Sequence, residues 1–345
     1  MTPTGLAGER TPASPAARRS EQPSLSDHRQ PMTAVTRDRT TSHTLGHRIS
    51  SFFYRHPRTR LASVLAIPLA WFVVVYLGSL LALLIQSFYA LDSFSGTVDE
   101  NFTLDTWRSM WSDVTRDIVL RTVTMAALVT IGAAVVALPI AYFMAKVASP
   151  RAKAVLFVAV LMPLWSSYIV RVLAWRQILN SDGVVTWVAD QINMVWVIDR
   201  ILDAPVIGGA DLTTSFAGQY VVFLYIWLPY MILPVQAAFE RVPNSLLEAS
   251  DDLGAKRMST FWKISWPLGL PGIVAGSIFT FSLTLGDYII PQLVGPSKPT
   301  IGLAIYQFQG VAGNLPLAAA YTAIPMIIMA IYLTIARRMG AFEAL

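Results

Sequence analysis

The sequence predicts an all-α fold: a polytopic membrane bundle of about six transmembrane helices, with one short helix outside the membrane between two of them. Two observations carry this prediction. Apolar residues make up 54% of the 345 residues and charged residues only 14%, whereas soluble domains carry about a quarter charged residues. The apolar residues also gather in stretches of about 20, the length that a helix needs to cross a bilayer.

Six stretches are long and apolar enough to span. They cover residues 61–88, 118–147, 154–178, 216–239, 273–293 and 315–336. Most of them contain a proline, which membrane helices tolerate when neighbouring helices satisfy the freed backbone carbonyl. We therefore expect a packed bundle of kinked helices rather than separate straight anchors.

The chain divides into a tail over 1–60, a membrane domain over 61–340 and a short end over 341–345. The tail holds ten arginines and four acidic residues, a net charge of +6, and is rich in Pro, Ser and Thr. This composition predicts a disordered, basic, cytoplasmic segment. Contact with anionic lipid or a partner is the alternative. Because no aromatic residue precedes Phe52, the tail does not indicate nucleic-acid binding.

The residue types also exclude classes of function. The chain has no cysteine, which excludes disulfides, thiolate nucleophiles and Cys-based metal sites. All four histidines precede the first span, so the membrane domain has no imidazole for acid–base catalysis or metal binding. We therefore predict that the protein is not an enzyme and binds no metal.

Loop charges predict the orientation. The tail, the turn near Arg151, the island 242–272 and the C-terminal end are basic or carry clustered basic residues. They alternate with 89–117, which has six acidic and two basic residues, and with 179–215, which has five aspartates and one arginine. Because basic loops stay on the cytoplasmic side, we expect a multi-pass protein of the cell (inner) membrane with both termini and the island in the cytoplasm.

The island 242–272 itself predicts a short helix followed by a sharp turn. Pro243 suits the first turn of a helix, and Gly254 suits a left-handed residue that ends one. Ser259 or Thr260 is expected to cap a second helix, and Pro267 to mark its return into the next span. A helix held at both ends by transmembrane segments is able to transmit a push.

The same island resembles the EAA loop of ABC importer permeases. Glu248-Ala249-Ser250, Gly254 and Ile264-Ser265-Trp266-Pro267 stand at that loop's spacing, with Ser250 in place of an alanine and Trp266 in place of a leucine. The resemblance implies a cytoplasmic coupling helix that an ATPase subunit grips. Its implied coupling residues are Leu246, Leu247, Glu248, Ala249, Ser250, Gly254, Ile264 and Pro267, with Leu246, Leu247 and Ser250 contacting the ATPase.

Two further stretches resemble signatures of the spermidine/putrescine branch of these permeases. One runs from Pro163 to Trp175 and the other from Ser282 to Pro291, followed by Gly295. Related motifs occur in permeases for ferric iron, phosphonates and other small solutes. The resemblance, which covers about residues 60–340, implies a polyamine as the substrate and those solutes as alternatives.

Asp287 is the charged residue that a polycation would meet within the fifth span. It is predicted about fifteen residues into that helix, and intramembrane charges favour a functional role. The candidate path or gate comprises Asp287, Tyr288, Trp165, Tyr168, Arg171 and Trp175, whose aromatic rings offer cation–π contacts. The alternatives are that Asp287 pairs with Arg171 or Arg176 to hold two helices, and that the aromatic residues only pack.

The chain has no G-x-x-x-x-G-K-[ST] phosphate loop, so ATP must be bound by a partner and no cofactor is expected here. The resemblance implies ATPase subunits, a second permease that is a different chain, and an extracytoplasmic solute-binding protein. An ion-coupled secondary transporter is the alternative from another class. It would be expected to show two related halves, and no internal repeat is evident.

Overall fold

The structure is a computed structural model that describes residues 57–92 and 94–338. The predicted tail over 1–60 lies almost wholly outside the described residues, as does the end over 341–345. By its contacts the chain divides into two units, Met1–Ile67 and Pro68–Leu345. The first contributes only the start of one helix to the described residues, and all the contacts given below lie within the second.

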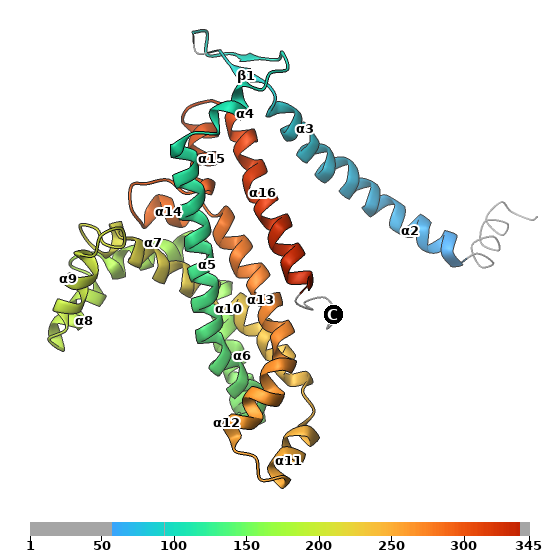
Figure 1. The fold of residues 1–345 in the computed structure, drawn as a ribbon, viewed down its shortest axis with the longest axis vertical. Helices are drawn as coiled ribbons and strands as arrows, with labels where there is room; N and C mark the ends of the chain where they lie inside the picture. The colour runs from blue at the N-terminus through green and yellow to red at the C-terminus, as the bar shows by residue number, and fades with distance from the viewer. Residues whose placement is uncertain (1–56, 93, 339–345) are drawn as a thin grey trace, which may run out of the picture. The chain divides into compact units, whose positions relative to one another are not determined.

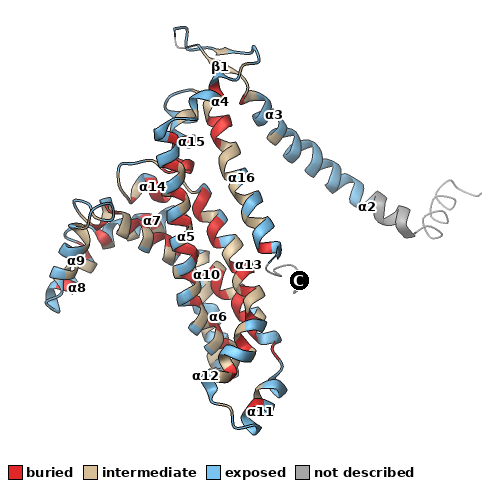
Figure 2. Ribbon diagram, in the orientation of Figure 1, coloured by how far each residue is buried: buried red, intermediate tan, exposed pale blue. Residues whose placement is uncertain are grey.

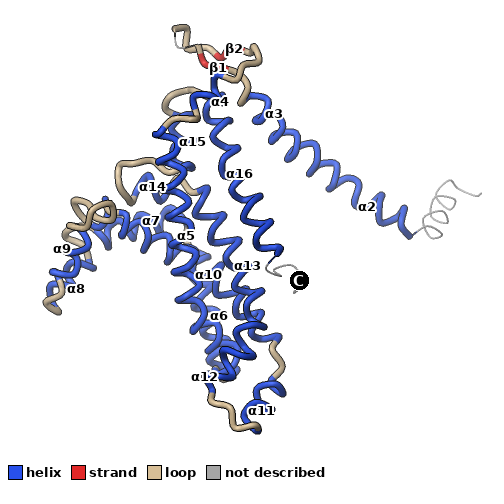
Figure 3. Tube along the Cα trace, in the orientation of Figure 1, coloured by secondary structure: helices blue, strands red, loops and turns tan. Residues whose placement is uncertain are grey.

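The described residues are mostly helical, which confirms the all-α prediction (Figures 1 and 3). The two strands, β1 Ala90–Leu91 and β2 Val98–Asp99, form one antiparallel pair. The helices are α2 Pro57–Trp71, α3 Gly78–Gln86, α4 Asp105–Ser109, α5 Asp113–Tyr142, α6 Pro150–Trp165, α7 Tyr168–Leu179, α8 Val184–Gln191, α9 Val195–Leu202, α10 Phe216–Arg241, α11 Asn244–Asp252, α12 Arg257–Thr260, α13 Trp266–Gly286, α14 Ile289–Leu293, α15 Ile301–Gly310 and α16 Leu315–Arg338. π turns η1 Phe72–Leu77, η2 Phe143–Val147 and η4 Phe261–Ser265 and the 3-10 turn η3 Leu212–Thr214 complete them.

Five of the predicted spans are single long apolar helical segments in the described residues. They are Val64–Gln86, Asp113–Val147, Phe216–Arg241, Arg257–Gly286 and Leu315–Arg338. The fifth of the predicted spans begins much earlier than expected, because α12, η4 and α13 run on as one helical segment. It also ends earlier, at Gly286, rather than continuing to residue 293.

The third predicted span, 154–178, is not one helix. Its halves, Pro150–Trp165 and Tyr168–Gln191, meet at a bend of 95°. Ser166, in extended conformation, and Ser167 separate them, and the Ser166 hydroxyl donates to the carbonyl of Pro163 at 2.8 Å. A serine hydroxyl that satisfies a carbonyl at a helix end competes with continuation of the helix. Apolar composition alone did not reveal this break.

The core of the second unit lies where α5, α10 and α13 pack against one another (Figure 2). The approach of α10 to α13 depends on glycines of α13. A Cβ on Gly272 would lie 2.4 Å from the Cβ of Ala238, and one on Gly269 would lie 2.3 Å from the Phe239 ring. Small residues that let helix backbones meet are typical of membrane helix interfaces. These three helices form the frame to which both candidate sites are attached.

Candidate functional site

Two regions contain the predicted site residues. The loop site is the 242–272 segment that joins α10 to α13 and includes α11. The Asp287 site lies where the break between α6 and α7 meets the break between α13 and α14.

The loop site contains the predicted helix and the predicted sharp turn. Helix α11 ends at Asp252 with Leu253 as its C-cap residue, and Gly254 follows with a φ of +72°. The amide of Ala255 donates to the carbonyl of Ser250 at 3.1 Å, and that of Gly254 to Asp251 at 2.9 Å. This arrangement satisfies carbonyls at the helix end. The predicted left-handed conformation of Gly254 is confirmed.

Two local predictions in the loop were wrong. Pro243 precedes α11 as its extended N-cap residue and is not in the first turn. The second helix begins at Arg257 after Lys256, which makes no side-chain cap, so neither Ser259 nor Thr260 caps it. Thr260 is instead buried, and its hydroxyl lies 2.8 Å from that of Ser250. Thr260 therefore packs inside the loop against Ser250 and does not act as the expected N-cap of the second helix.

The predicted coupling residues lie on different faces of the loop. Leu246, Glu248 and Ala249 are exposed, Leu247 is half-buried, and Ser250 is buried with only 8% of its surface exposed. Ser250 therefore holds the loop together and does not offer a surface to a partner, which corrects its predicted contact. Ile264 lies half-buried in η4 and Pro267 is exposed at the start of α13.

Sequence reasoning missed two exposed apolar side chains of the loop. Leu253 is 88% exposed and Met258 is 68% exposed. Both stand next to charged or polar residues, Leu253 after Asp251-Asp252 and Met258 after Lys256-Arg257, which is the signal that was available for them. Together with Leu246 they give the loop site an exposed apolar surface, which is the kind of surface that marks interaction sites.

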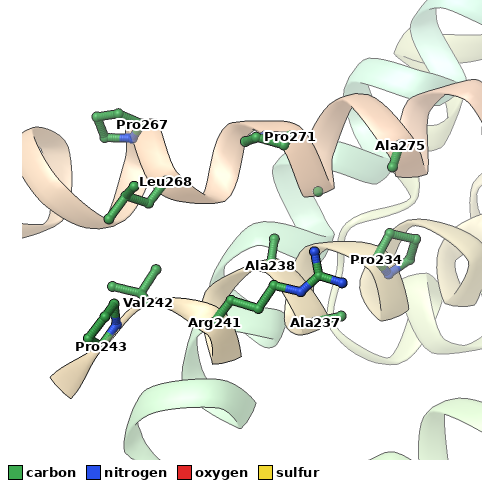
Figure 4. A pocket seen from close by; sticks show the side chains of 11 residues that line it. Pro234, Ala237, Ala238, Arg241, Val242, Pro243, Pro267, Leu268, Pro271 and Ala275 are labelled. Carbon is green, nitrogen blue, oxygen red and sulfur yellow. The ribbon is translucent and has the colours of Figure 1, made fainter. Parts of the chain in front are cut away.

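A groove of about 400 Å³ lies beside the loop, between the end of α10 and the start of α13 (Figure 4). Val242 and Pro243 border it from the α10 side, and Pro267 and Leu268 from the α13 side. The segments that lead into and out of the loop therefore border one groove. Any displacement of one segment against the other changes its width.

The Asp287 site joins the two helix breaks. Asp287 is not within a helix: it follows α13 in extended conformation and accepts a hydrogen bond from the amide of Ile290 at 2.9 Å. Its other carboxylate oxygen accepts a hydrogen bond from the hydroxyl of Tyr168, at the start of α7. The prediction that Asp287 lies within the helix of the fifth span is therefore wrong, because α13 ends at Gly286, one residue before it.

The alternative that Asp287 pairs with Arg171 or Arg176 is also wrong among the described residues. The Arg171 guanidinium carbon lies 6.0 Å from the centre of the Tyr168 ring. Its Nε and one Nη are buried without a hydrogen-bond partner in the described part of the chain. Arg176 is exposed. The carboxylate and the guanidinium thus both adjoin Tyr168 without pairing.

A cavity of about 350 Å³ adjoins Asp287, bordered also by Tyr168, Tyr288 and Trp227. Tyr168 stacks on Trp227 with ring centres 5.7 Å apart, and Tyr288 stacks on Tyr306 at 4.8 Å. Sequence reasoning missed Trp227 and Tyr306, which lie in apolar segments that give no local signal.

Two of the predicted aromatic residues do not border this cavity. Trp165 is 81% exposed, and Trp175 packs on Tyr225 at 5.1 Å. In the described residues, no three His, Cys, Asp or Glu side chains gather as metal ligands would. The Asp287 site is therefore a single carboxylate among aromatic rings, with one unpaired guanidinium behind Tyr168.

Comparison with known proteins places this geometry in a family. Residues 137–341 match the family described as the binding-protein-dependent transport system inner membrane component. The inner membrane ABC transporter permease protein YdcU of Escherichia coli K12 is 50% identical over 298 residues, which cover 86% of this chain and 95% of that protein. The spermidine/putrescine transport system permease protein PotB of Haemophilus influenzae is 27% identical over 267 residues, 77% of this chain and 89% of that one.

Solved structures agree on the fold. A bacterial ABC transporter involved in the import of the acidic polysaccharide alginate contains a chain with a TM-score of 0.64 and 17% identity, which covers 84% of this chain and 99% of that one. Family and fold are those of non-enzymatic transport components, so the prediction that the chain is not an enzyme is confirmed, and a secondary transporter is excluded. The chain belongs to the inner membrane components of binding-protein-dependent transport systems and is a multi-pass permease subunit of an ABC importer.

Proposed function

We propose that this permease forms part of the path for a polyamine of the spermidine/putrescine class. The observation that carries the proposal is the Asp287 site, in which an unpaired carboxylate borders a cavity lined by Tyr168, Tyr288 and Trp227. An ammonium group gains Coulomb energy from a carboxylate and further attraction from aromatic faces, and both are larger where water is scarce. The Tyr168 hydroxyl fixes the carboxylate in place without neutralising it.

The relatives support the same substrate class. The PotB permeases, which are named for spermidine and putrescine, match 66–77% of this chain at 26–28% identity. The permease at 50% identity carries no substrate in its name, and the alginate transporter shares only the fold. The polyamine proposal therefore rests on the Asp287 site together with the PotB similarity.

A small anionic solute such as a phosphonate is the second candidate. Two buried nitrogens of Arg171 have no partner in the described residues, and a buried guanidinium without a partner is costly. An anion that met these nitrogens would remove that cost. A polyamine would require Asp287 and an anion would require Arg171. One experiment with variants of both residues therefore separates the two candidates.

We also propose that the loop site attaches to a separate ATPase subunit, through Leu246, Leu253 and Met258 on its exposed surface and with Glu248 and Gly254 shaping α11. In this proposal Leu247, Ala249, Ile264 and Pro267 support that surface. ATP is bound by the ATPase. The complex comprises ATPase subunits, a second and different permease chain and an extracytoplasmic solute-binding protein. The loop and both termini face the cytoplasm.

The substrate is tested by uptake into vesicles that contain the whole complex. The chain is reconstituted with its ATPase, sister permease and binding protein, and ATP-dependent uptake of labelled spermidine, putrescine and a phosphonate is measured. Polyamine uptake that is lost in Asp287→Asn and survives in Arg171→Lys supports the polyamine path. Phosphonate uptake that is lost in Arg171→Lys and survives in Asp287→Asn supports the anion instead. ATP turnover without polyamine uptake contradicts the polyamine proposal.

The loop is tested separately through ATP turnover. Gly254→Pro removes the left-handed residue that ends α11, because proline requires a φ near −65°. We expect it to abolish substrate-stimulated turnover while the chain still inserts into the membrane. Normal stimulated turnover, or no association of the wild-type chain with any ATPase, contradicts the coupling role.

A further inference from the structure

Lys146 connects the loop site to a helix that the chain does not join to it. It lies in η2, the π turn at the end of α5. Its ammonium group donates to the carbonyl oxygen of Val242 at 2.6 Å and to the side-chain oxygen of Asn244 at 3.0 Å. Val242 is the C-cap residue of α10, and Asn244 begins α11. One side chain of α5 thus holds both sides of the bend at which α11 starts.

The bend needs such a donor. Pro243 has no amide hydrogen, and the amide of Leu246 is bonded to the carbonyl of Pro243 at 3.2 Å. The carbonyl of Val242, a buried residue, is therefore left with no backbone donor from α11. A lysine near a helix C-terminus satisfies such a carbonyl and is favoured by the helix dipole.

A neighbouring ion pair also lies near the C-terminal end of α10, but it does not involve α11. Lys153, in the first turn of α6, pairs with Glu240 of α10 at 2.8 Å, and Glu240 also accepts from Gln236 at 2.8 Å. The far end of α11 is held by the Ser250–Thr260 contact. Helix α11 is therefore supported at both ends, and its first support is Lys146.

Helix α5 continues from this support to the Asp287 site. Near its other end, the hydroxyl of Thr122 accepts a hydrogen bond from the amide of Ile301 at 3.0 Å, at the start of α15. The next residue, Gly302, packs so closely on the backbone of Asp287 that a Cβ would lie 2.5 Å from its carbonyl oxygen. At about 1.5 Å per residue, the 24 residues from Thr122 to Lys146 span roughly 36 Å.

We propose that Lys146 is a positioning residue that transmits movement of α11 to α5, and through α5 to the Asp287 site; this rests on the coupling role proposed for the loop. Without it, α11 pulls only on the two helices to which the chain connects it. With it, three helices move together. Lys146 contributes neither to ATP chemistry nor to substrate contact.

The test compares lysine variants in the complete reconstituted complex. Lys146→Met keeps the length of the side chain and removes its donors. We expect the ratio of solute taken up to ATP hydrolysed to fall by about five-fold or more, the lower range of allosteric coupling, with co-purification of the ATPase unchanged. Lys146→Arg, which keeps donors within reach, is expected to restore most of the ratio.

Lys153→Met is the matched control. It makes the same chemical change near the same end of α10 but removes a contact with α10 alone, so the ratio is expected to stay within about two-fold of wild type, less than the coupling effect. If Lys146→Met does not accumulate in the membrane, Asn244→Ala decides, because it removes only one acceptor; a ratio equal to wild type then overturns the proposal.

The outcomes distinguish a failure of the proposed role of Lys146 from a failure of the proposed coupling role of the loop. A wild-type ratio in Lys146→Met, together with loss of stimulated turnover in Gly254→Pro, overturns the role of Lys146 and leaves the coupling role of the loop intact. Equal losses in Lys146→Met and Lys153→Met overturn it as well, because they indicate general support of the end of α10. Normal coupling in Gly254→Pro contradicts the role of the loop itself.

Discussion

The hydroxyl of Tyr168 donates a hydrogen bond to the carboxylate of Asp287, 119 residues further along the chain. Each residue stands at a place where a transmembrane segment stops being helical: Tyr168 begins α7 after the 95° bend, and Asp287 follows the end of α13. Irregular backbone within a membrane protein is tolerated where it is buried in protein or lines a cavity. The bond therefore holds together the two interruptions that create the candidate substrate site.

Removing this bond is expected to weaken the site without removing its rings. Tyr168→Phe keeps the stacking on Trp227 and should lower the free energy of unfolding by about 1 kcal/mol, since membrane hydrogen bonds average ~0.6 and bonds to charged groups reach ~1.5–3 kcal/mol. Thermal unfolding of the purified complex measures it. Tyr230→Phe is the control, because the Tyr230 ring also packs on Trp227 while the Asp287 carboxylate is bonded to Tyr168 and the amide of Ile290 instead. Equal shifts in both variants would argue against the bond.

The contact of α10 with α13 should be sensitive to a single methyl group. A Cβ at position 272 meets the Cβ of Ala238 at 2.4 Å and the carbonyl oxygen of Pro234 at 2.6 Å, and neither is the end of a flexible side chain. We expect Gly272→Ala to destabilise the bundle by roughly 1–3 kcal/mol through overpacking. Gly78→Ala, whose Cβ would meet nothing within 4 Å, should be neutral or stabilising. Thermal midpoints in the same detergent compare the two, and a stable Gly272→Ala would refute the close packing.

The effect of a substitution at Gly254, in the turn after α11, should depend only on how readily the new residue adopts a left-handed backbone conformation. Gly254 has a φ of +72°, and a Cβ there would touch nothing. Alanine in the left-handed region costs about 1–2 kcal/mol, whereas asparagine visits it more readily. If the end of α11 matters for coupling, Gly254→Ala should reduce stimulated ATP turnover more than Gly254→Asn does. Equal turnover in the two variants would show that the left-handed turn is dispensable.

The two hydroxyls of the buried contact between α5 and α16 should contribute unequally to stability when each is removed by mutation. The Thr115 hydroxyl lies 2.6 Å from the hydroxyl of Tyr321 and 3.0 Å from that of Ser112. Tyr321→Phe leaves Thr115 a second partner and should cost about 0.6 kcal/mol. Thr115→Val leaves the buried Tyr321 hydroxyl without one and should cost roughly 1–3 kcal/mol. Thermal unfolding of both variants checks the order, and the reverse order would contradict the assignment of partners.

Features of the chain were predicted correctly from the sequence where the residues of one short segment were enough to determine them. Five of the spans needed only a run of apolar residues, because the bilayer imposes its own length on any helix that crosses it. The left-handed Gly254 was predictable because glycine alone enters that region without cost. The family followed from the ordered motifs and is confirmed by the similarity to binding-protein-dependent permeases.

Predictions failed where residue type and composition did not determine the backbone conformation or the bonding partner. The third span breaks at Ser166 and Ser167, and its apolar composition looks the same whether it is straight or bent. Ser250 was expected on the surface of the loop and is buried against Thr260 instead. Asp287 was expected to meet Arg171 or Arg176 and meets Tyr168. In the last two cases the side chain had several partners of suitable chemistry within the sequence.

By itself, the sequence determined an all-α membrane protein of this family, with a short helix between its fourth and fifth spans, because hydrophobic length, backbone conformation and motif spacing are properties of neighbouring residues. Only the tertiary structure decided that Tyr168 meets Asp287 and that Lys146 meets Val242 and Asn244. These pairs join segments 96 to 119 residues apart, and a polar group in a packed bundle bonds to whichever partner the packing of its helices brings within reach.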